Sequence, residues 1–230
     1  MSSRSRPAAS AMRQQLIQAG IDLLESDGPQ ALQARRVAAA AGGSTMAVYT
    51  HFGGMSELVA AIVGEAFSRF GAAIGAAEPT AHPITDFFVM GHAYRTYALA
   101  NPQRYLLMFG LSALSDFPGK TAVAGSTDFI AGPVTTETGA ETFEQLVSVV
   151  QRMIADGHIR GPVREVAARV WSLIHGAVLL ELSGSFGTGD QAVARVLFPA
   201  TIDLLVGMGA DTRQVSTSAD RAAQILAAAR

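Results

Sequence analysis

The chain has 230 residues, no cysteine and a formal net charge of −2. This length suits one large domain or a small domain joined to a larger one, and the lack of cysteine excludes disulfides and thiolate metal sites. Because 49% of the residues are hydrophobic and only 16% are charged, against about 25% in an average protein, we expect excess apolar surface to be covered in a homo-oligomer.

The N-terminus and the longest apolar stretch argue against secretion and membrane insertion. The first residues, MSSRSRPAAS, are polar and small, unlike a signal peptide. The stretch Val170 to Leu180 has 11 residues and contains His175, whereas a membrane span needs roughly 18 to 20 apolar residues. The sequence therefore predicts a cytoplasmic protein with no membrane partner.

Helical periodicity runs through most of the chain. Apolar side chains recur every three to four residues in 16–24, 58–73 and 143–154, which is typical of amphipathic helices. Asn101-Pro102 interrupts the apolar segment 84–111, so we expect one helix to end there and the next to begin with proline in its first turn. No alternation of period two competes, and the sequence predicts an all-α fold of about nine helices.

The second half combines a long connection with two further helices. Residues 115–140 are rich in Gly, Ser, Thr and Pro, which predicts a long, mobile connection with at most a short helix. Helices are expected at about Val163 to Ser183 and about Gln191 to Met208, and Pro199 should bend the second. Residues 211–230 are predicted to form a tail or a short terminal helix.

Residues 37–52, VAAAAGGSTMAVYTHF, join a slim helix to a polar and aromatic one. Ala38 stands four residues before Gly42 and Val48 six after it, which is the spacing of a helix-turn-helix. Small side chains and glycine are needed there because two short helices cross closely through a brief turn. Ser44 is the expected N-cap of the second helix, whose first N–H groups and dipole can face a phosphate.

The outer face of this second helix carries the candidate DNA-reading side chains. Thr45 and Met46 lie at its start and are expected to meet base edges in the major groove, while Tyr49 and His51 are expected to reach phosphate oxygens. Polar residues at the start of the slim helix are expected to hold the flanking backbone. The predicted DNA-binding set is Gln33, Arg35, Arg36, Ser44, Thr45, Met46, Tyr49, Thr50 and His51.

The charge distribution also favours a polyanion at the front of the chain. Residues 1–55 carry five arginines against three acids, whereas residues 56–230 carry twelve basic and sixteen acidic side chains. Arg4 and Arg6 are candidates for a disordered arm on the DNA.

Residues 12–63 resemble the N-terminal domain of the TetR (tetracycline-repressor-like) transcriptional regulators. The resemblance rests on a first helix, Asp27-Gly28, the helix-turn-helix, and the motifs YTHF and ELVAAI in that order. The segment VWSLIHGAVLLEL, Val170 to Leu182, resembles the Trp-x-x-x-His-Gly (WHG) signature of one C-terminal subgroup. Three departures from the family pattern lower the expected DNA affinity: Gly43 stands where Val is usual, Met55 where Lys is usual, and Gln33 where a Thr cap is usual.

The resemblance implies a division of the chain and a function. Residues 1–54 would form the DNA-binding domain, residues 55–210 a helical ligand-binding and dimerisation domain, and residues 211–230 the tail or short helix. The protein would be a DNA-binding transcriptional regulator without a cofactor, commonly a repressor that binds an inverted-repeat operator as a homodimer. A small, largely apolar or aromatic ligand would release it.

The two helices near the C-terminus are apolar on more than one face, which predicts a four-helix dimer interface, although an intramolecular core remains an alternative. The predicted interface residues are Val170, Leu173, Ala177, Val193, Leu197, Ala200 and Leu204. Aromatic, Met and Leu side chains on the central helices predict an apolar ligand cavity, with Arg95 among its few polar contacts. Its predicted lining is Phe87, Met90, Tyr94, Tyr97, Phe109, Leu146, Met153, Trp171, His175 and Leu179.

Other interpretations of the same residues stay open. The Gly-rich turn is also compatible with an ordinary corner between two helices. A nucleotide-binding Gly-rich loop is disfavoured because the sequence has neither the preceding strand nor the required Gly spacing. The histidines show no metal-ligand spacing, and an enzyme would have to use His92 or His175 as a general base beside Glu181 without any supporting motif. A helical protein-binding or scaffold module without specific DNA recognition is the remaining alternative.

Overall fold

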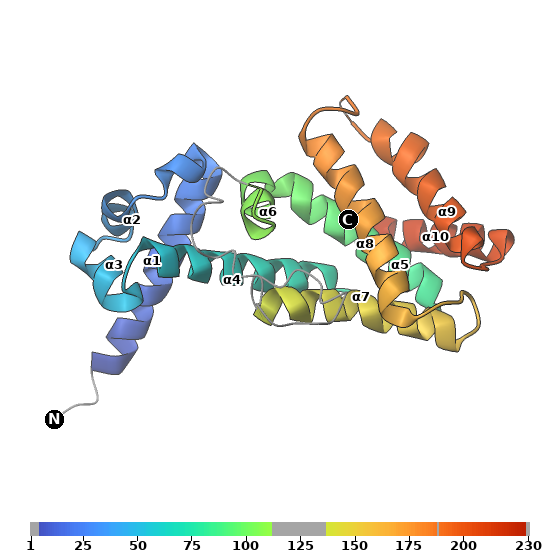
Figure 1. Cartoon of the computed structure of the whole chain (residues 1–230), viewed down its shortest axis with the longest axis horizontal. Helices are drawn as coiled ribbons and strands as arrows, with labels where there is room; N and C mark the ends of the chain where they lie inside the picture. Colours follow the sequence, from blue (N-terminus) through green and yellow to red (C-terminus); the bar gives the residue numbers. More distant parts are fainter. Residues whose placement is uncertain (1–4, 112–136, 188, 229–230) are drawn as a thin grey trace. The chain divides into compact units, whose positions relative to one another are not determined.

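The computed structural model describes residues 5–111, 137–187 and 189–228 (Figure 1). Over these residues the chain forms ten α-helices, one 3₁₀ turn and one π-helical turn, with no strand. The predicted all-α class is confirmed. None of the helices in the described ranges is long and apolar enough to cross a membrane. Arg4 and most of the predicted connection, residues 115–136, lie outside the described residues.

The chain divides into two compact units, and within the described ranges the first contains residues 5–69, 101–111 and 137–140. Its core is built from apolar residues of several helices, among them Leu16, Leu24, Val48, Ile62 and Leu107. The first unit comprises α1 (Ser5–Asp27), η1 (Pro29–Ala31), α2 (Ala34–Ala40), α3 (Thr45–Phe52), most of α4 (Met55–Ile74) and α6 (Pro102–Met108).

The second unit contains residues 70–100 and the chain from Glu141 onward. Apolar side chains of α5, α7, α8, α9 and α10 meet in its core, including Phe87, Val150, Met153, Val170 and Leu205. Its helices are α5 (Pro83–Ala100), α7 (Glu137–Ala155), α8 (Val163–Leu182), the π turn η2 (Val193–Leu197), α9 (Phe198–Gly207) and α10 (Thr212–Ala228).

Pro199 marks the point where the C-terminal helical segment changes its geometry. It stands at the second position of α9, directly after the π turn η2. Proline has no N–H for the carbonyl four residues earlier and its ring crowds that carbonyl, so a wider local turn relieves the clash. The segment for which the sequence predicts one bent helix is therefore η2 followed by α9.

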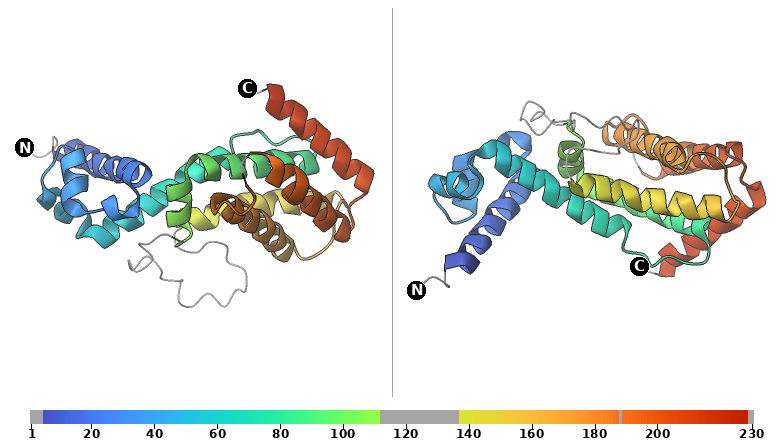
Figure 2. Two further views of the ribbon diagram at one scale, coloured as in Figure 1. Left: turned by 90° about the horizontal axis from the view of Figure 1, so that it is seen from above. Right: turned by 60° about the horizontal axis from the view of Figure 1, so that its bottom comes forward.

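Helix α10 is longer and better packed than a tail. It has 17 residues and buries Val215, Ser218, Ala219 and Ala222, and it packs chiefly against α5 (Figure 2). Its buried stripe is mostly small side chains, which give a weak hydrophobic signal in the sequence although they allow two helices to approach closely. The sequence pattern underestimates this helix for that reason.

The turn between α2 and α3 depends on one glycine more than on its neighbour. Gly42 has φ = +71°, a left-handed conformation that other residues rarely adopt, whereas Gly43 does not have a positive φ. A Cβ at Gly43 would lie 3.5 Å from the Met12 sulfur and 3.6 Å from the Ala47 Cβ, which are ordinary contacts. The two glycines therefore differ in what they require.

We expect Gly42→Ala to lower the free energy of unfolding by about 1–2 kcal/mol, because alanine is strained at this φ. Gly43→Ala should instead raise it by about 0.4–1 kcal/mol, because alanine restricts the unfolded chain and fits the folded one. Differential scanning calorimetry of the two variants beside the wild type measures both effects. Equal destabilisation by both substitutions would contradict this account of the turn.

Candidate DNA-binding face and ligand site

Helix α3 presents a polar face to solvent and an apolar face to the core of the first unit. Val48 is fully buried, while Met46 is 66% exposed and Tyr49 51% exposed. Thr45 and Thr50 are exposed beside them, and His51 is half-buried. The exposed set thus forms one continuous surface on a short helix, as its sequence spacing predicts; that these side chains contact DNA stays a prediction.

Ser44 occupies the N-cap position of α3 in extended conformation, with φ = −95° and ψ = 159°. Its side chain makes no capping hydrogen bond within the described part of the chain. The Gly53 that ends α3 is left-handed, with φ = +82°, and its N–H donates to the Tyr49 carbonyl at 2.9 Å. The C-terminal end of α3 is therefore capped, whereas the N–H groups of its first turn are not satisfied by the Ser44 hydroxyl.

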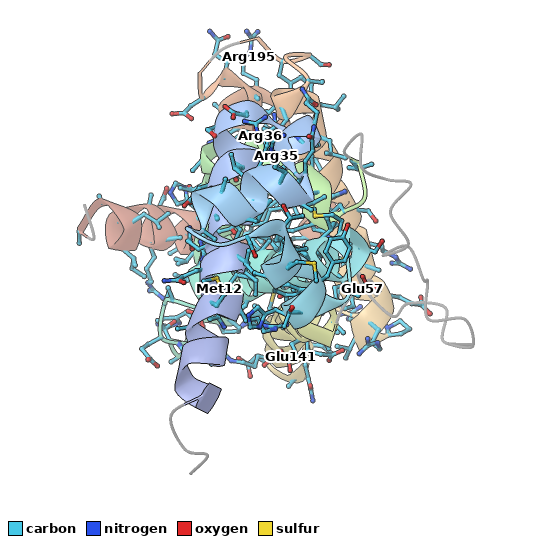
Figure 3. The ribbon with its side chains drawn as sticks, turned by 90° about the vertical axis from the view of Figure 1, so that its left-hand side faces the viewer. Met12, Arg35, Arg36, Glu57, Glu141 and Arg195 are labelled. Carbon is cyan, nitrogen blue, oxygen red and sulfur yellow. The ribbon has the colours of Figure 1, made fainter. Side chains whose placement is uncertain are left out.

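The three predicted backbone-holding residues of α2 have different surroundings. Arg36 forms an ion pair with Asp27, so its charge is already partly compensated. Gln33, the N-cap residue of α2, donates from Nε2 to the Gln30 carbonyl at 3.1 Å and makes no cap bond in the described structure. Arg35 is exposed and has no ion pair with any residue of the described ranges. Figure 3 shows Arg35 and Arg36 close together on this end of the first unit.

One cation beside α3 is absent from the predicted set. The guanidinium carbon of Arg13, on α1, lies 4.9 Å from the centroid of the Phe52 ring at the end of α3. Arg13 and Phe52 are far apart in the sequence, and no local pattern links them, so only the crossing of α1 and α3 brings them together.

Most of the predicted ligand-lining residues belong to the second unit. Phe87, Tyr94 and Met153 are buried there. Met90, Tyr97, Leu146, Trp171, His175 and Leu179 are half-buried. Phe109 belongs to the first unit, where its ring lies 4.9 Å from that of Tyr105 and 5.6 Å from that of Phe67.

An aromatic cluster joins α5, α7 and α8 within the second unit. The Tyr94 hydroxyl lies 3.2 Å from Nδ1 of His175, and the His175 ring lies 5.7 Å from that of Trp171. The ring of Phe143, on α7, lies 5.6 Å from that of Trp171. The predicted residues Tyr94, Trp171 and His175 therefore come together, and the structure adds Phe143, which the sequence pattern assigns only to the apolar stripe of α7.

Burial lowers the pKa of His175 below its ordinary value of 6.5. The folded protein then binds this proton less readily than the unfolded chain, so the free energy of unfolding falls as the pH drops from 6.5 through the lowered pKa. Well above pH 6.5 the imidazole is neutral in both states and the contribution is complete.

We expect the stability advantage of the wild type over His175→Asn to be greater at neutral pH than in mild acid. Asparagine cannot bind this proton. The variant therefore does not lose the unfolding free energy that the wild type loses in acid through protonation of His175. Melting temperatures of both proteins at a series of pH values measure the difference. A gap that does not change with pH would show that His175 titrates alike in the folded and unfolded chain.

Arg95 is held by two acids rather than facing a ligand site. Its guanidinium donates to both carboxylate oxygens of Glu181, each at 2.8 Å, and to Asp190 at 3.2 Å. The hydrogen bond from Arg95 to Glu181 raises the pKa of Arg95 most. Burial lowers this pKa and the attraction of Glu181 and Asp190 raises it, so that the pKa is raised on balance. To contact a ligand, Arg95 would therefore have to leave this ion pair. The same ion pair engages Glu181, the acid that the enzyme alternative would use.

The predicted dimer residues divide into two groups. Val170 and Ala177 are buried within the second unit and leave little surface for a partner. Leu173, Val193, Leu197, Ala200 and Leu204 are not fully buried. The large apolar side chains exposed on α8, η2 and α9 are Leu180, Val196, Phe198 and Val206, which the prediction did not include.

Two family models match the chain. Residues 16–62 match the bacterial regulatory proteins of the tetR family, and residues 87–205, slightly more than half of the chain, match the tetracyclin repressor-like C-terminal domain. The chain belongs to the TetR family. TetR proteins are transcription regulators, so the helix-turn-helix of α2 and α3 and the larger helical unit are the two standard parts of such a regulator.

Solved structures have the same fold. A protein of unknown function from Rhodococcus sp. RHA1 is 26% identical, with a TM-score of 0.68 over 86% of this chain and 95% of that one. The TetR family regulator PfmR from Thermus thermophilus is 21% identical, with a TM-score of 0.57 over 85% and 99%. RolR, solved with resorcinol, is 12% identical, with a TM-score of 0.61 over 94% and 96%. No curated protein sequence matches this TetR chain significantly.

Within the described ranges of this TetR protein, no three His, Asp or Glu side chains gather as a metal site would require.

Proposed function

We propose that this TetR protein is a transcriptional repressor that binds an inverted-repeat operator as a homodimer and is released by a small, largely apolar or aromatic ligand. The observation that carries the proposal is the exposed face of α3, where Thr45, Met46, Tyr49 and Thr50 project from a helix whose opposite side is anchored by Val48. A helix of this kind fits the major groove, where its first residues meet base edges.

Three side chains of this face have a proposed role. Thr45 and Met46 read bases, through a hydroxyl and an apolar contact respectively, while Tyr49 donates its hydroxyl to a phosphate. The open N-terminus of α3 after Ser44 accepts a phosphate as well. Arg35 is the stronger phosphate candidate of the α2 pair, because Arg36 would have to leave Asp27.

The proposed dimer uses the outer side of α8 and α9. Leu180 on α8, Val206 on α9 and Val196 on the adjoining turn η2 are exposed apolar side chains, and Leu173 and Leu204 on the same two helices are half-buried. Two such helices from each subunit would form a four-helix interface. We place the division between DNA-binding and ligand-binding domains near residue 54, assign the chain to the WHG subgroup by Trp171, His175 and Gly176, and expect it to act in the cytoplasm at the nucleoid.

The proposed effector site lies in the second unit around Tyr94, Trp171 and His175. Its aromatic surroundings favour a ligand with an apolar body and one or two hydrogen-bonding groups. We infer that ligand binding tilts α4, which carries residues of both units, and so moves the DNA-reading helices out of register. A ligand that prefers the DNA-incompetent state by about a hundredfold supplies about 2.7 kcal/mol of coupling, enough for substantial release.

Selection of bound fragments from random-sequence duplex DNA tests the function as a whole. We expect an inverted repeat whose half-sites are separated by one helical turn, about 10 base pairs, or a multiple of it. Failure to enrich any sequence, together with retention on DNA that does not depend on salt, would favour the scaffold alternative.

Reciprocity tests the effector. Resorcinol, the ligand of RolR, is a reasonable first probe of a screen for small molecules that release the selected DNA. Any compound that weakens DNA binding must itself be weakened by DNA to the same factor, because the coupling free energy is shared. A releasing compound whose affinity is the same with and without DNA would contradict this mechanism.

A further inference from the structure

Arg13 is an exposed arginine whose position is fixed by a ring rather than by an acid. Its guanidinium carbon lies 4.9 Å from the centroid of Phe52, the last residue of α3. Among the described residues it forms no ion pair and no side-chain hydrogen bond. A cation stacked on an aromatic face is oriented without losing its charge.

The other arginines of the first unit make this position unusual. Arg36, Arg69 and Arg104 are paired with Asp27, Glu65 and Glu25 respectively. Of the arginines in this unit whose side chains the structure describes, only Arg13 and Arg35 have no ion pair. Figure 3 shows Met12, the residue before Arg13 on α1, well apart from Arg35 and Arg36 at this end of the unit.

A guanidinium that lies with its flat face over an aromatic ring keeps its N–H donors available to another group. Stacking uses the flat face of the guanidinium, whereas its N–H groups lie in the plane and point from its edge. The same edge is the one that binds a phosphate through two parallel hydrogen bonds. The Phe52 ring can therefore hold Arg13 and leave its edge open to an anion.

The location of Phe52 suggests which anion this is. Phe52 borders the exposed face of α3 and is followed by Gly53, Gly54 and Met55, where α4 begins. The major groove is about 12 Å wide, so a helix lying in it has a phosphate backbone on each side. The resemblance to the TetR pattern implies a phosphate-binding lysine at position 55, and this chain has Met55 there.

We propose that Arg13 binds a DNA backbone phosphate at the C-terminal end of α3 and takes the place of the lysine that is missing at position 55. The inference rests on the proposed DNA-binding function. Arg35 binds a backbone phosphate near α2, and Arg13 binds a separate phosphate beside α3. Each subunit therefore contacts the DNA backbone at two places. Arg13 positions α3 without reading a base.

The test measures the salt dependence of binding to a labelled 20-base-pair random-sequence duplex by fluorescence anisotropy. Each lost phosphate contact reduces the magnitude of the slope of log K against log salt by about 0.9. Arg13→Gln removes one contact from each subunit, so it should reduce the magnitude by about 1.8 for a dimer. Arg13→Lys should keep most of the slope because the charge remains. Arg213→Gln, which removes the same charge from an exposed site on α10, should change nothing.

A second arm asks whether the charge can be moved. Adding Met55→Lys to Arg13→Gln should restore the wild-type slope, whereas Met55→Lys alone should add little because the phosphate is already bound. Full additivity of the two cations would overturn the claim that they serve one phosphate. Melting temperatures of the same variants show whether each one is folded, so that a lost phosphate contact is not confused with unfolding. Arg13→Lys and the double variant keep a positive charge and therefore report on the charge alone.

The outcomes also separate this inference from the function on which it rests. One outcome would overturn the role of Arg13 and leave the DNA-binding function in place. In it the wild type binds in a salt-dependent way, Arg35→Gln reduces the magnitude of the slope, and Arg13→Gln leaves the slope unchanged. A wild type that binds this duplex without any salt dependence overturns both.

Discussion

Leu180→Asp should convert the protein from a dimer to a monomer and weaken its binding to the two-half-site operator by roughly 10² to 10⁴-fold. The side chain is 46% exposed on α8, one of the helices of the proposed dimer, where an aspartate would be buried without a partner. The loss of affinity follows because two linked recognition helices bind as one unit, and their effective concentration contributes roughly that factor. Sedimentation measures the oligomeric state, and anisotropy measures the affinity.

Ile225→Asp is the matched control for this variant. Ile225 is also a partly exposed apolar residue, but it lies on α10, outside the proposed interface. It should leave both the dimer and the operator affinity unchanged. A dimer that survives Leu180→Asp and dissociates in Ile225→Asp would move the interface from α8 and α9 to α10.

Arg95→Met should be the most destabilising single substitution in the second unit outside its apolar core, at about 3 kcal/mol. Arg95 and Glu181 are only 13% and 9% exposed, so removing the guanidinium leaves a carboxylate in a poorly hydrated place with neither of its two hydrogen bonds. Part of the charge network reaches Asp190 at the surface, which places the cost at the low end of the range for buried pairs. Calorimetric unfolding at neutral pH measures the loss.

The double variant Arg95→Met/Glu181→Leu distinguishes a stranded charge from lost packing. We expect it to recover most of the stability, because two apolar side chains of similar size can fill the seam between α5 and α8 without an unpaired charge. A double variant as unstable as Arg95→Met would mean that the packing of the Arg95 stem, rather than the charge of Glu181, sets the cost.

The sequence was most informative where a pattern is local. The helix-turn-helix follows from the spacing of Ala38, Gly42 and Val48, because steric limits on a close crossing act over a few residues. The break at Asn101-Pro102 follows equally from the chemistry of proline. The exposed side of α3 is then fixed by helical periodicity alone.

Features that depend on which helices meet were harder to predict. Nothing near Arg36 in the sequence indicates its ion pair with Asp27, and nothing near Arg13 indicates the ring of Phe52. On α8, periodicity alone does not tell which apolar stripe faces the core of the unit: Val170 and Ala177, which the sequence assigns to the interface, are buried within the unit, and the interface itself stays a prediction. Long-range packing decided these cases.

The central claim is that the exposed face of α3 reads base sequence, and comparing the DNA selected by the wild type with that selected by Met46→Gln tests it most directly. The account predicts an inverted repeat in both, with a new preference for adenine at one symmetric position of each half-site, because a glutamine amide pairs with the edge of adenine. An identical selected sequence in the two proteins, or no enriched sequence in either, would contradict it.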